Sequence, residues 1–376
     1  MKIAFISDAV YPWNVGGLET LENTEAQELA KTYEVHFFSL KWPGMKKDFV
    51  KNSIHYHTLH DITAERFYRH GRRSIREAIF YTAGLGRIFF HRFDCIQSNE
   101  FPIVHIPLLR LYCTLTGCKF ILDVHEVWEK DYWTGYLGGG VVGNLANALA
   151  NASLKMADAY IANSSMTAEG LKRLGIDSNR IRIFSPVIDD KKLSSIKTGK
   201  VKNRVIFSGR LIKEKRLDKW LKAVKSASGS VRGIKAVIIG EGPEKNSIKR
   251  LISRLKIDHI VKMHDFYHGE DKDELYKSIK ESKLLLQMSE REGLSIIVLE
   301  SIALGTPVLL PESSPIPDEV KEMCVVKEEI SIPYELEKIL KSNDKGEFIR
   351  NIHGIEKFST SNTNRFYSEL FKTLRK

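Results

Sequence analysis

The chain has 376 residues, of which 43% are hydrophobic and 28% are charged, and its formal net charge is +11. This length favours two domains, and the composition argues against a collagen, a disordered tail and a polytopic membrane protein. The positive charge disfavours a purely cationic partner, whereas nucleic acid, anionic lipid and a phosphorylated small molecule stay open.

The cysteines and the N-terminus indicate the compartment. Four cysteines without zinc-binding spacing are too few for a disulfide framework in this chain, so we expect reduced thiols, a cytoplasmic protein and no metal site. The first apolar run ends at Asp8, too early for a signal peptide, and no stretch reaches the roughly 18 apolar residues that span a bilayer. We therefore expect any membrane contact to be peripheral, on the cytoplasmic membrane face.

Short apolar segments alternate with longer helical patterns along the whole chain. Continuous apolar runs of this kind are typical of buried parallel strands, each followed by a helical crossover, and two sheets accommodate them more naturally than one. The predicted strands are at 3–7, 34–40, 94–98, 119–125, 159–164, 204–209, 236–242, 283–289 and 306–310.

These strands and a polar stretch between them predict the domain boundaries. We expect a first α/β domain at 1–188, a linker at 189–203 and a second α/β domain at 204–351. The last residues, 352–376, predict a helix whose apolar side packs outside the second core.

In open parallel sheets, ligands bind beyond the carboxyl ends of the strands, so the residues that follow each strand are the candidates for a site. After the first strand come Gly16 and Gly17, and a helix begins near Leu18. The two glycines let backbone N–H groups approach an anion, and a plain turn explains them equally well. Since no Walker loop and no GxGxxG follows this strand, an NTPase and a nicotinamide dehydrogenase are disfavoured.

Two cations follow the strand at 204–209. Arg210 comes directly after it, and Lys215 stands just before a helix predicted from Leu217. The helix N-terminus and both cations favour an anion here, with a pair of solvated surface charges as the alternative. The next strand ends in the turn Gly240-Glu241-Gly242, where the backbone can approach a ligand closely.

The segment 289–307 carries three carboxylates, Glu290, Glu292 and Glu300, of which the last two are candidates for a site. Its apolar pattern predicts a buried helix from Leu294 to Leu304, with Glu300 in the middle and no cation near it in sequence. A buried carboxylate must be paired, protonated or facing a ligand. Glu292 precedes it by eight positions, on the order of 10 Å at ~1.5 Å per residue. That separation is too long for the carboxylate pair of a retaining glycosidase and suits the two ends of a sugar nucleotide.

With Arg210 and Lys215, the glycine turn at 240–242 and the Glu292–Glu300 pair in this order, the sequence resembles the GT-B glycosyltransferases of family 4. The resemblance covers most of the chain, from the glycine loop at 16–17 to Pro307, and is densest from 205 to 309. It implies an α/β fold of the GT-B type, with two Rossmann-like domains whose parallel sheets face a cleft, the first binding the acceptor and the second the nucleotide-sugar. The sequence departs from the family at Arg216, where the family usually has Gly, and at Ser301, where it usually has Ala.

The resemblance also implies roles for the candidate residues. Arg210 and Lys215 would hold the donor diphosphate, Glu300 would hydrogen-bond the nucleotide ribose, and Glu292 would face the donor sugar. His125 matches the family's histidine that faces the donor sugar, although a lone histidine at a strand end is more often structural. The expected catalytic set is thus His125, Arg210, Lys215 and Glu292. The expected donor-binding set is Gly16, Gly17, Glu241, Gly293, Leu294 and Glu300.

The activity that this resemblance implies is retaining transfer of a hexose-type sugar from a nucleotide-sugar to a hydroxyl of a glycan or lipid-linked acceptor. A UDP-sugar is expected because the family often uses uridine; no residue selects the base. Arg210, Lys215 and helix N-termini can stabilise the leaving diphosphate without a metal, so no metal cofactor is expected. The alternatives are a GT-B sugar-nucleotide epimerase and a non-catalytic basic binding protein; without a nucleic-acid-binding signature, nucleic acid is not an expected partner.

The stretch 64–93 contains seven arginines against two glutamates, interleaved with aromatic and aliphatic residues. This mixture is typical of an interfacial helix on anionic lipid, and helices that pack on the first sheet are the alternative. We expect such docking to be salt-sensitive and to present a lipid-linked acceptor to the first domain.

Overall fold

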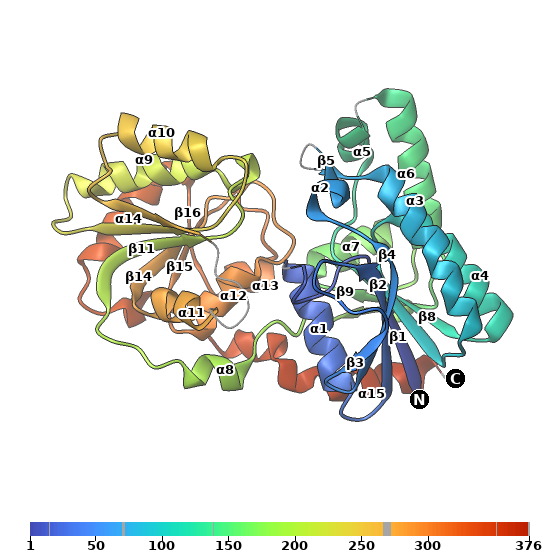
Figure 1. The fold of residues 1–376 in the computed structure, drawn as a ribbon. Helices are drawn as coiled ribbons and strands as arrows, with labels where there is room; N and C mark the ends of the chain where they lie inside the picture. The colour runs from blue at the N-terminus through green and yellow to red at the C-terminus, as the bar shows by residue number, and fades with distance from the viewer. Residues whose placement is uncertain (15, 70–71, 138, 266–271, 351, 375–376) are drawn as a thin grey trace. The chain divides into compact units, whose positions relative to one another are not determined.

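The computed structural model describes residues 1–14, 16–69, 72–137, 139–265, 272–350 and 352–374. It divides the chain into two compact units (Figure 1), one of Met1–Pro186 with Thr360–Lys376 and one of Val187–Ser359. We call them the N-terminal unit and the C-terminal unit. Each is built on a sheet of mostly or wholly parallel strands with helical crossovers, which confirms the predicted α/β class.

The N-terminal unit has an eight-stranded sheet in the order β10-β9-β8-β7-β1-β2-β4-β3, in which only β3 pairs antiparallel. A two-stranded pair, β5 with β6, is separate from it. The strands are β1 (Lys2–Ile6), β2 (Glu34–Lys41), β3 (Phe49–Lys51), β4 (Ile54–Asp61), β5 (Tyr68–Arg69), β6 (Arg72–Arg73), β7 (Cys95–Asn99), β8 (Lys119–Val124), β9 (Ala159–Ala162) and β10 (Ile181–Ile183).

Helices cover this sheet on both faces. The crossover from β1 to β2 runs in the opposite direction along the sheet to that from β7 to β8, so right-handed connections place α1 and α4 on opposite faces. The helices are α1 (Gly17–Leu29), α2 (Ala64–Phe67), α3 (Ile75–Gly84), α4 (Ile106–Thr116), α5 (Lys130–Leu137), α6 (Gly140–Leu154), α7 (Ser165–Arg173) and α15 (Thr363–Leu374), with 3-10 turns η1 (Leu85–Phe90), η2 (Ile103–His105), η3 (Ser178–Arg180) and η9 (Thr360–Asn362).

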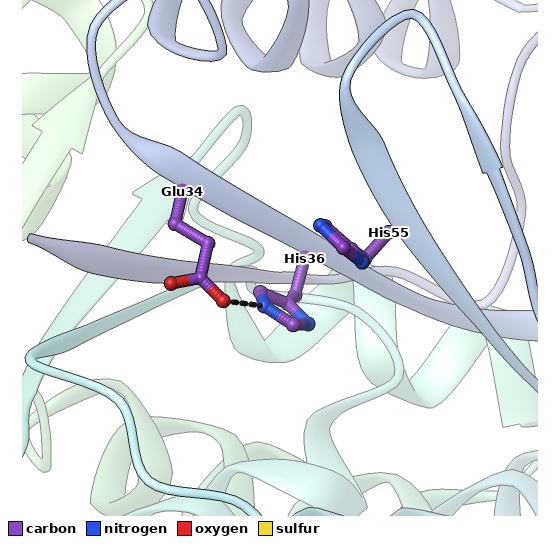
Figure 2. Close-up of side chains that lie close together, drawn as sticks. All are labelled: Glu34, His36 and His55. Carbon is purple, nitrogen blue, oxygen red and sulfur yellow. Dashed lines mark hydrogen bonds and ion pairs between the residues drawn. The ribbon is translucent and has the colours of Figure 1, made fainter.

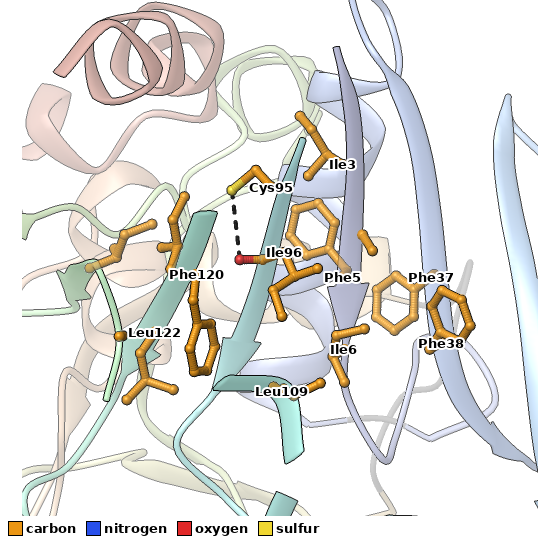
Figure 3. Close-up of a cluster of buried hydrophobic side chains, with 14 of the residues drawn as sticks. Ile3, Phe5, Ile6, Phe37, Phe38, Cys95, Ile96, Leu109, Phe120 and Leu122 are labelled. Carbon is orange, nitrogen blue, oxygen red and sulfur yellow. Dashed lines mark hydrogen bonds between the residues drawn. The ribbon is translucent and has the colours of Figure 1, made fainter. Parts of the chain in front are cut away.

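The central strands of this sheet carry its core. Phe5 on β1, Phe37 on β2 and Phe120 on β8 are buried, and the rings of Phe5 and Phe37 stack with centroids 5.9 Å apart (Figure 3). Cys95 lies in the same cluster as a buried thiol. Because both faces of these strands are covered, their sequences are continuous apolar runs without alternation.

The C-terminal unit has a six-stranded sheet in the order β13-β12-β11-β14-β15-β16, with every pairing parallel. Its strands are β11 (Lys202–Ser208), β12 (Lys235–Ile239), β13 (Val261–His264), β14 (Ser282–Leu286), β15 (Val308–Pro311) and β16 (Val325–Lys327). Its helices are α8 (Asp190–Ser195), α9 (Leu217–Ser228), α10 (Lys245–Arg254), α11 (Lys272–Lys280), α12 (Ile296–Ala303), α13 (Asp318–Lys321) and α14 (Ile332–Lys341), with 3-10 turns η4 (Lys213–Lys215), η6 (Glu329–Ser331), η7 (Lys345–Phe348) and η8 (Ile352–Phe358).

The expected linker at 189–203 contains regular structure. It holds α8 and the first residues of β11, and it begins inside the C-terminal unit. Leu193 and Ile196 are buried in that unit's core, and the Ser359 hydroxyl donates a hydrogen bond to Asp190. The stretch is polar because α8 is short and buries little besides these two side chains. Its amino-acid composition is therefore like that of a linker, although it is part of the C-terminal unit.

The chain end also differs from the expectation. Residues 352–362 form 3-10 turns, and α15 packs in the N-terminal unit rather than outside the second core. The hydroxyl of Tyr367 is hydrogen-bonded to Glu25 Oε2 at 2.9 Å and to Gln97 Oε1 at 2.8 Å. This buried polar contact, together with the packing of Phe371 against Tyr33, fixes α15 on α1.

The stretch 64–93 forms α2, the β5–β6 pair, α3 and η1 instead of one interfacial helix. Three of its arginines form ion pairs with protein carboxylates: Arg66 with Glu77, Arg73 with Asp8, and Arg87 with Asp48. Residues 70–71 and the side chains of Tyr68, Arg69 and Arg72 lie outside the described part of the chain. Within that part, no helix has both the length and the apolar character needed to cross a bilayer.

Candidate donor site and the class of the protein

The C-terminal sheet reverses its strand order between β11 and β14. From β11 the chain proceeds to β12 and β13 on one side, and then returns to place β14 on the other side. In open α/β sheets, ligands bind outside the carboxyl ends of the strands at such a point. The residues that follow β11 and β14 are therefore the first candidates for ligand contact, and the predicted Arg210, Lys215 and Glu292 are among them.

Lys215 and Glu292 meet directly. Lys215 ends η4 after β11, and its ammonium forms an ion pair with the Glu292 carboxylate in the loop after β14. Gln287, directly after β14, donates from Nε2 to Glu292 Oε1 at 2.6 Å. The backbone joins the same two loops, because Glu290 N–H donates to the carbonyl of Glu214 at 2.8 Å. Two of the predicted residues thus form one charged cluster at the switch point.

The elements behind this cluster are fixed by packing. Trp220 on α9 is fully buried, and its indole N–H donates to the carbonyl of Leu286 at 3.1 Å. This contact joins the helix that follows Lys215 to the strand that precedes Gln287. The position of Lys215 relative to Glu292 is therefore set by the core as well as by their charges.

Arg210 lies at the same sheet end and is exposed. Arg216, which follows Lys215, has φ 48° and ψ 44°, the left-handed conformation that favours glycine. Its guanidinium is held by Asp218 at 3.0 Å and by Glu290. The family's usual glycine at this position is thus explained by backbone geometry, and here the two carboxylates stabilise an arginine in its place.

The glycines of the turn after β12 are required by a backbone contact inside the protein, and the expected ligand contact at Glu241 stays a prediction. A Cβ at Gly240 would overlap the carbonyl oxygen of Gly209, and a Cβ at Gly242 would overlap the backbone of Leu211. Leu211 N–H donates to the carbonyl of Glu241 at 2.7 Å, while the Glu241 side chain is exposed. The close backbone approach is therefore to the loop after β11, and it shapes the segment that carries Arg210.

The loop between β14 and α12 holds buried polar atoms without protein partners. Gln287 Oε1, Ser289 Oγ and Ser295 Oγ are buried and accept or donate no hydrogen bond within the described residues. Ser295 has φ 60°, so α12 begins at Ile296 and not at Leu294 as predicted. Buried polar groups are nearly always satisfied in proteins, so a polar ligand or ordered water would complete this loop, which includes Gly293 and Leu294.

Glu300 is buried on α12 and paired. Lys272 Nζ and the Tyr276 hydroxyl donate to its Oε1 at 2.8 and 2.7 Å. Burial and the nearby Glu300 carboxylate raise the pKa of Tyr276 well above its ordinary value. Of the three possibilities that the sequence left open for Glu300, the structure shows pairing. Its partners lie on α11, more than 20 residues before Glu300 in the chain.

His125 follows β8 in the N-terminal unit. Its Nε2 lies 3.5 Å from Asp123 Oδ1, and its backbone N–H donates to Glu100 Oε1 at 3.1 Å. Burial lowers the pKa of His125, but Asp123, Glu100 and Glu22 outweigh burial and raise it to about 10. The carboxylates near His125 therefore favour the protonated form of its imidazole.

Gly16 caps α1, which begins at Gly17. A Cβ at Gly16 would collide with the carboxylate of Glu19, a buried residue in the first turn of α1. Because Glu19 already places a negative charge at this helix N-terminus, the site is less suited to an anionic ligand than its glycines suggest. The donor contact at Gly16 and Gly17 stays a prediction.

The sequence did not predict several side chains that lie beside Glu292, His125 and Glu300. Gln287, Asp123 and Glu100 stand at or just beyond the carboxyl ends of β14, β8 and β7, so the strand-end rule applies to them as well. Lys272 and Tyr276 lie one turn apart on α11 and have no local pattern that points to Glu300. Only the tertiary structure shows that pair.

One group of residues in the N-terminal unit could hold a metal ion. Ligand atoms of Glu34, His36 and His55 lie within 4.8 Å of one another (Figure 2). The three residues are near the N-terminal ends of strands β2 and β4. His36 Nε2 is 2.9 Å from Glu34 Oε1, and the ammonium of Lys2 is 3.0 Å from the same oxygen. The lysine already neutralises this carboxylate, and the group is at the sheet end opposite to His125. That sugar transfer needs no metal stays a prediction.

Comparison with known families identifies the class. Residues 15–192 match the model of Glycosyltransferase Family 4, and residues 189–343 match the model of Glycosyl transferases group 1. The chain therefore carries two glycosyltransferase family domains, one centred on each unit. With parallel α/β sheets in both units and the structural relatives below, it has the fold of the GT-B glycosyltransferases.

Individual relatives agree with this class. The chain is 24% identical over 248 residues to the O-antigen biosynthesis glycosyltransferase WclY of Escherichia coli, a match that spans 62% of this chain and 65% of that protein. The crystal structure of Anabaena HepE with UDP and glucose is similar in fold, with a TM-score of 0.72, 14% identity and coverage of 99% and 100%. Sucrose-phosphate synthase of Thermosynechococcus elongatus has a TM-score of 0.74, 14% identity and coverage of 99% and 98%.

Proposed function

We propose that this chain transfers a hexose-type sugar, with retention of anomeric configuration, from a nucleotide-sugar to a hydroxyl of a glycan or lipid-linked acceptor. The observation that carries the proposal is the Lys215–Glu292–Gln287 cluster at the β11–β14 switch point. It places a cation, a carboxylate and unsatisfied polar atoms where a ligand binds in this fold. The two glycosyltransferase domains give that cluster its reaction class.

The charges of the site fit departure of a nucleoside diphosphate. Cleavage of the anomeric bond leaves an oxocarbenium-like sugar and builds negative charge on the diphosphate. Arg210, Lys215 and the N-terminal turn of α12 would stabilise that charge, and fixed cations of this kind lower the barrier because they need no reorganisation. No side-chain nucleophile is assigned: a donor phosphate oxygen would take the acceptor proton on the face that the diphosphate leaves.

The remaining residues would orient the donor. Glu300 would accept a hydrogen bond from the ribose, and its neighbours Lys272 and Tyr276 would hold the carboxylate for that contact. The imidazolium of His125 would donate to a hydroxyl of the donor sugar. The first donor to test is UDP-glucose, since HepE has been solved in complex with it. The name of WclY points to an O-antigen-type glycan as the acceptor class.

A donor panel tests the proposal. The full chain is incubated with UDP-, GDP- and ADP-sugars, and the melting temperature is recorded, because a ligand that binds the folded state raises it. One donor is expected to stabilise the protein, with turnover in the presence of acceptor glycan and the α or β configuration of that donor kept in the product by NMR. Inverted product would overturn the retaining mechanism, and conversion of the sugar with donor alone would indicate an epimerase.

A further inference from the structure

Five aromatic side chains lie together beyond the carboxyl ends of β7 and β8. They are Phe101 after β7, Trp128 after β8, and Tyr132, Trp133 and Tyr136 on α5. The Trp128 ring is central: its centroid lies 5.2 Å from that of Phe101, 4.4 Å from Tyr132, 4.9 Å from Trp133 and 5.7 Å from Tyr136. We call these five residues the Trp128 cluster.

The cluster borders the point where the N-terminal sheet reverses its strand order. The chain proceeds from β1 to β2 on one side of β1 and later returns to place β7 on the other side. Ligands of open α/β sheets bind beyond the carboxyl ends of the strands at such a point. Arg73, bound to both oxygens of Asp8 after β1, lies 5.3 Å from the centroid of the Phe101 ring. The cluster is therefore placed where a ligand of the N-terminal unit is expected.

Packing against α6 explains only one side of the cluster. Trp133 is 6% exposed and forms a small core with Ala150 of α6. A Cβ at Gly143 of α6 would overlap the backbone of Thr134, so the two helices approach closely there. The other four aromatic side chains of the cluster are partly exposed. They keep ring surface open to solvent that packing within the chain does not use.

Trp133 has an unsatisfied donor. Its indole N–H is buried and has no acceptor within the described residues. Buried donors are nearly always hydrogen-bonded, so a ligand oxygen or an ordered water would complete it. Polar groups also stand at the edges of neighbouring rings. The Trp128 indole N–H donates to Glu126 Oε2 at 2.7 Å, and the Arg73 backbone N–H donates to the Tyr136 hydroxyl at 3.2 Å.

Apolar ring faces with polar groups at their edges match a sugar. The C–H faces of a pyranose pack on aromatic rings, and its hydroxyls exchange hydrogen bonds with the polar groups beside them. An acyl chain would leave those polar groups unsatisfied. A phosphate would require an excess of cations. The charged and titratable residues around the cluster instead include more carboxylic acids than bases: Asp8, Glu100, Glu126, Glu129 and Asp131 with Arg73, His125, Lys130 and Arg173.

We propose that the Trp128 cluster binds a neutral sugar ring of the acceptor glycan. Glu126 connects the cluster to His125, because it follows His125 in the chain and its carboxylate holds the Trp128 indole. A glycan on the cluster would therefore be held by the loop that carries His125. The role as an acceptor site rests on the proposed function, whereas binding of the glycan itself needs neither donor nor transfer.

Glycan binding without donor tests the site. The full chain is applied to an array of neutral and phosphorylated O-antigen oligosaccharides, and those that bind are titrated by tryptophan fluorescence. We expect saturable binding of a neutral oligosaccharide that changes little between low and high salt, because no ion pair contributes to it. Absence of binding to every neutral oligosaccharide, or binding to phosphorylated ones alone, would overturn the proposal.

Removal of single rings locates the site. Trp128→Ala and Tyr132→Ala are each expected to weaken glycan binding about tenfold or more, because aromatic contact area is lost. Tyr334→Ala, at a tyrosine that is 71% exposed in the C-terminal unit, is the control and is expected to leave binding unchanged. Circular dichroism checks the fold, and Tyr132→Ala decides the question if the more central Trp128→Ala does not fold. Equal glycan binding by Tyr132→Ala and Tyr334→Ala would contradict the site.

Kinetics distinguish ligand contact from a structural role. Tyr132→Ala is expected to raise KM for the acceptor and to leave KM for the donor unchanged, since it removes a contact to the acceptor alone. Loss of kcat with both KM values unchanged would contradict an acceptor contact. If a neutral glycan binds through the cluster and no donor is turned over, the proposed function fails and the glycan site stands.

Discussion

The ammonium of Lys215 is paired with the carboxylate of Glu292, across the point where the C-terminal sheet reverses its strand order. The pair joins the loop after β11 to the loop after β14, and Gln287 adds a second donor to the same carboxylate oxygen. Lys215 is thereby held at the sheet end without any ligand. A diphosphate arriving there would meet a cation that is already positioned.

Replacement of either cation tests this arrangement. Lys215→Ala and Arg210→Ala are each expected to lower turnover on the order of 10² or more, because each removes stabilisation of charge that grows in the transition state. The matched control is Lys213→Ala, an exposed lysine in the same 3-10 turn, which is expected to keep turnover within about twofold of the unmodified chain. Steady-state kinetics with one donor measure all three. Normal turnover in both Lys215→Ala and Arg210→Ala would rule out the diphosphate role.

Glu300→Gln tests the ribose contact. The amide keeps the shape and can still accept from Lys272 and Tyr276, but it loses the charge of the acceptor. Donor affinity is expected to fall by about 1.5–3 kcal/mol, which is roughly 10- to 150-fold. Isothermal titration calorimetry with the donor measures it.

Tyr276→Phe is the control for Glu300. It removes one hydrogen bond to the carboxylate and keeps the charge, so it is expected to reduce stability by about 1 kcal/mol with a smaller effect on donor affinity. If Glu300→Gln binds the donor as tightly as the unmodified chain, Glu300 serves only the α11–α12 contact.

The strands that sequence predicted were those with uninterrupted apolar runs, such as β1, β8, β11 and β14. β4 was missed because its sequence, Ile54–Asp61, alternates buried positions with histidines and other partly exposed side chains. It lies next to the edge strand β3, where one face of the sheet is less completely covered, and there the pattern changes from continuous to alternating. Together with the short strands β3 and β10, which were also missed, β4 accounts for the three strands of the first sheet that the sequence did not predict.

The candidate site was predictable where chemistry follows a strand end and unpredictable where it crosses between helices. Arg210, Lys215 and Glu292 have positions that the parallel-sheet rule identifies. The partners of Glu300 on α11 depend on how two helices pack, which no spacing in the chain records. The glycines after β12 were recognised as a close approach, but sequence could not tell a ligand from the backbone of Gly209 and Leu211.

Gly242→Ala tests that interpretation. Gly242 has φ 153°, and an added Cβ would overlap the backbone of Leu211, so unfolding free energy is expected to fall by about 1–3 kcal/mol or more. Gly135→Ala is the control, because a Cβ there meets no atom within 4 Å and alanine favours the helix. Urea denaturation measures both. Equal stability of the two variants would contradict the packing role.

His57 gives the protein an acid sensitivity that can be isolated. Burial is the main cause that lowers the pKa of His57 to about 4, and His36, His91 and Arg87 add to it, while Asp48 opposes them. Its ring nitrogen Nε2 is 2.7 Å from Nδ1 of His36. The imidazole is therefore neutral in the folded protein at pH values where an unfolded histidine is already charged.

The sign of the effect follows from proton binding. Below the ordinary value of 6.5 the unfolded chain binds a proton that folded His57 does not, so this contribution to stability is complete above pH 6.5 and is lost as the pH falls toward 4. His57→Gln is expected to lose less stability than the unmodified chain between pH 6.5 and 4, measured as urea-unfolding free energy at several pH values. His259→Gln, at an exposed histidine, is expected to follow the unmodified chain. Parallel pH profiles for all three proteins would show that His57 does not carry the acid sensitivity.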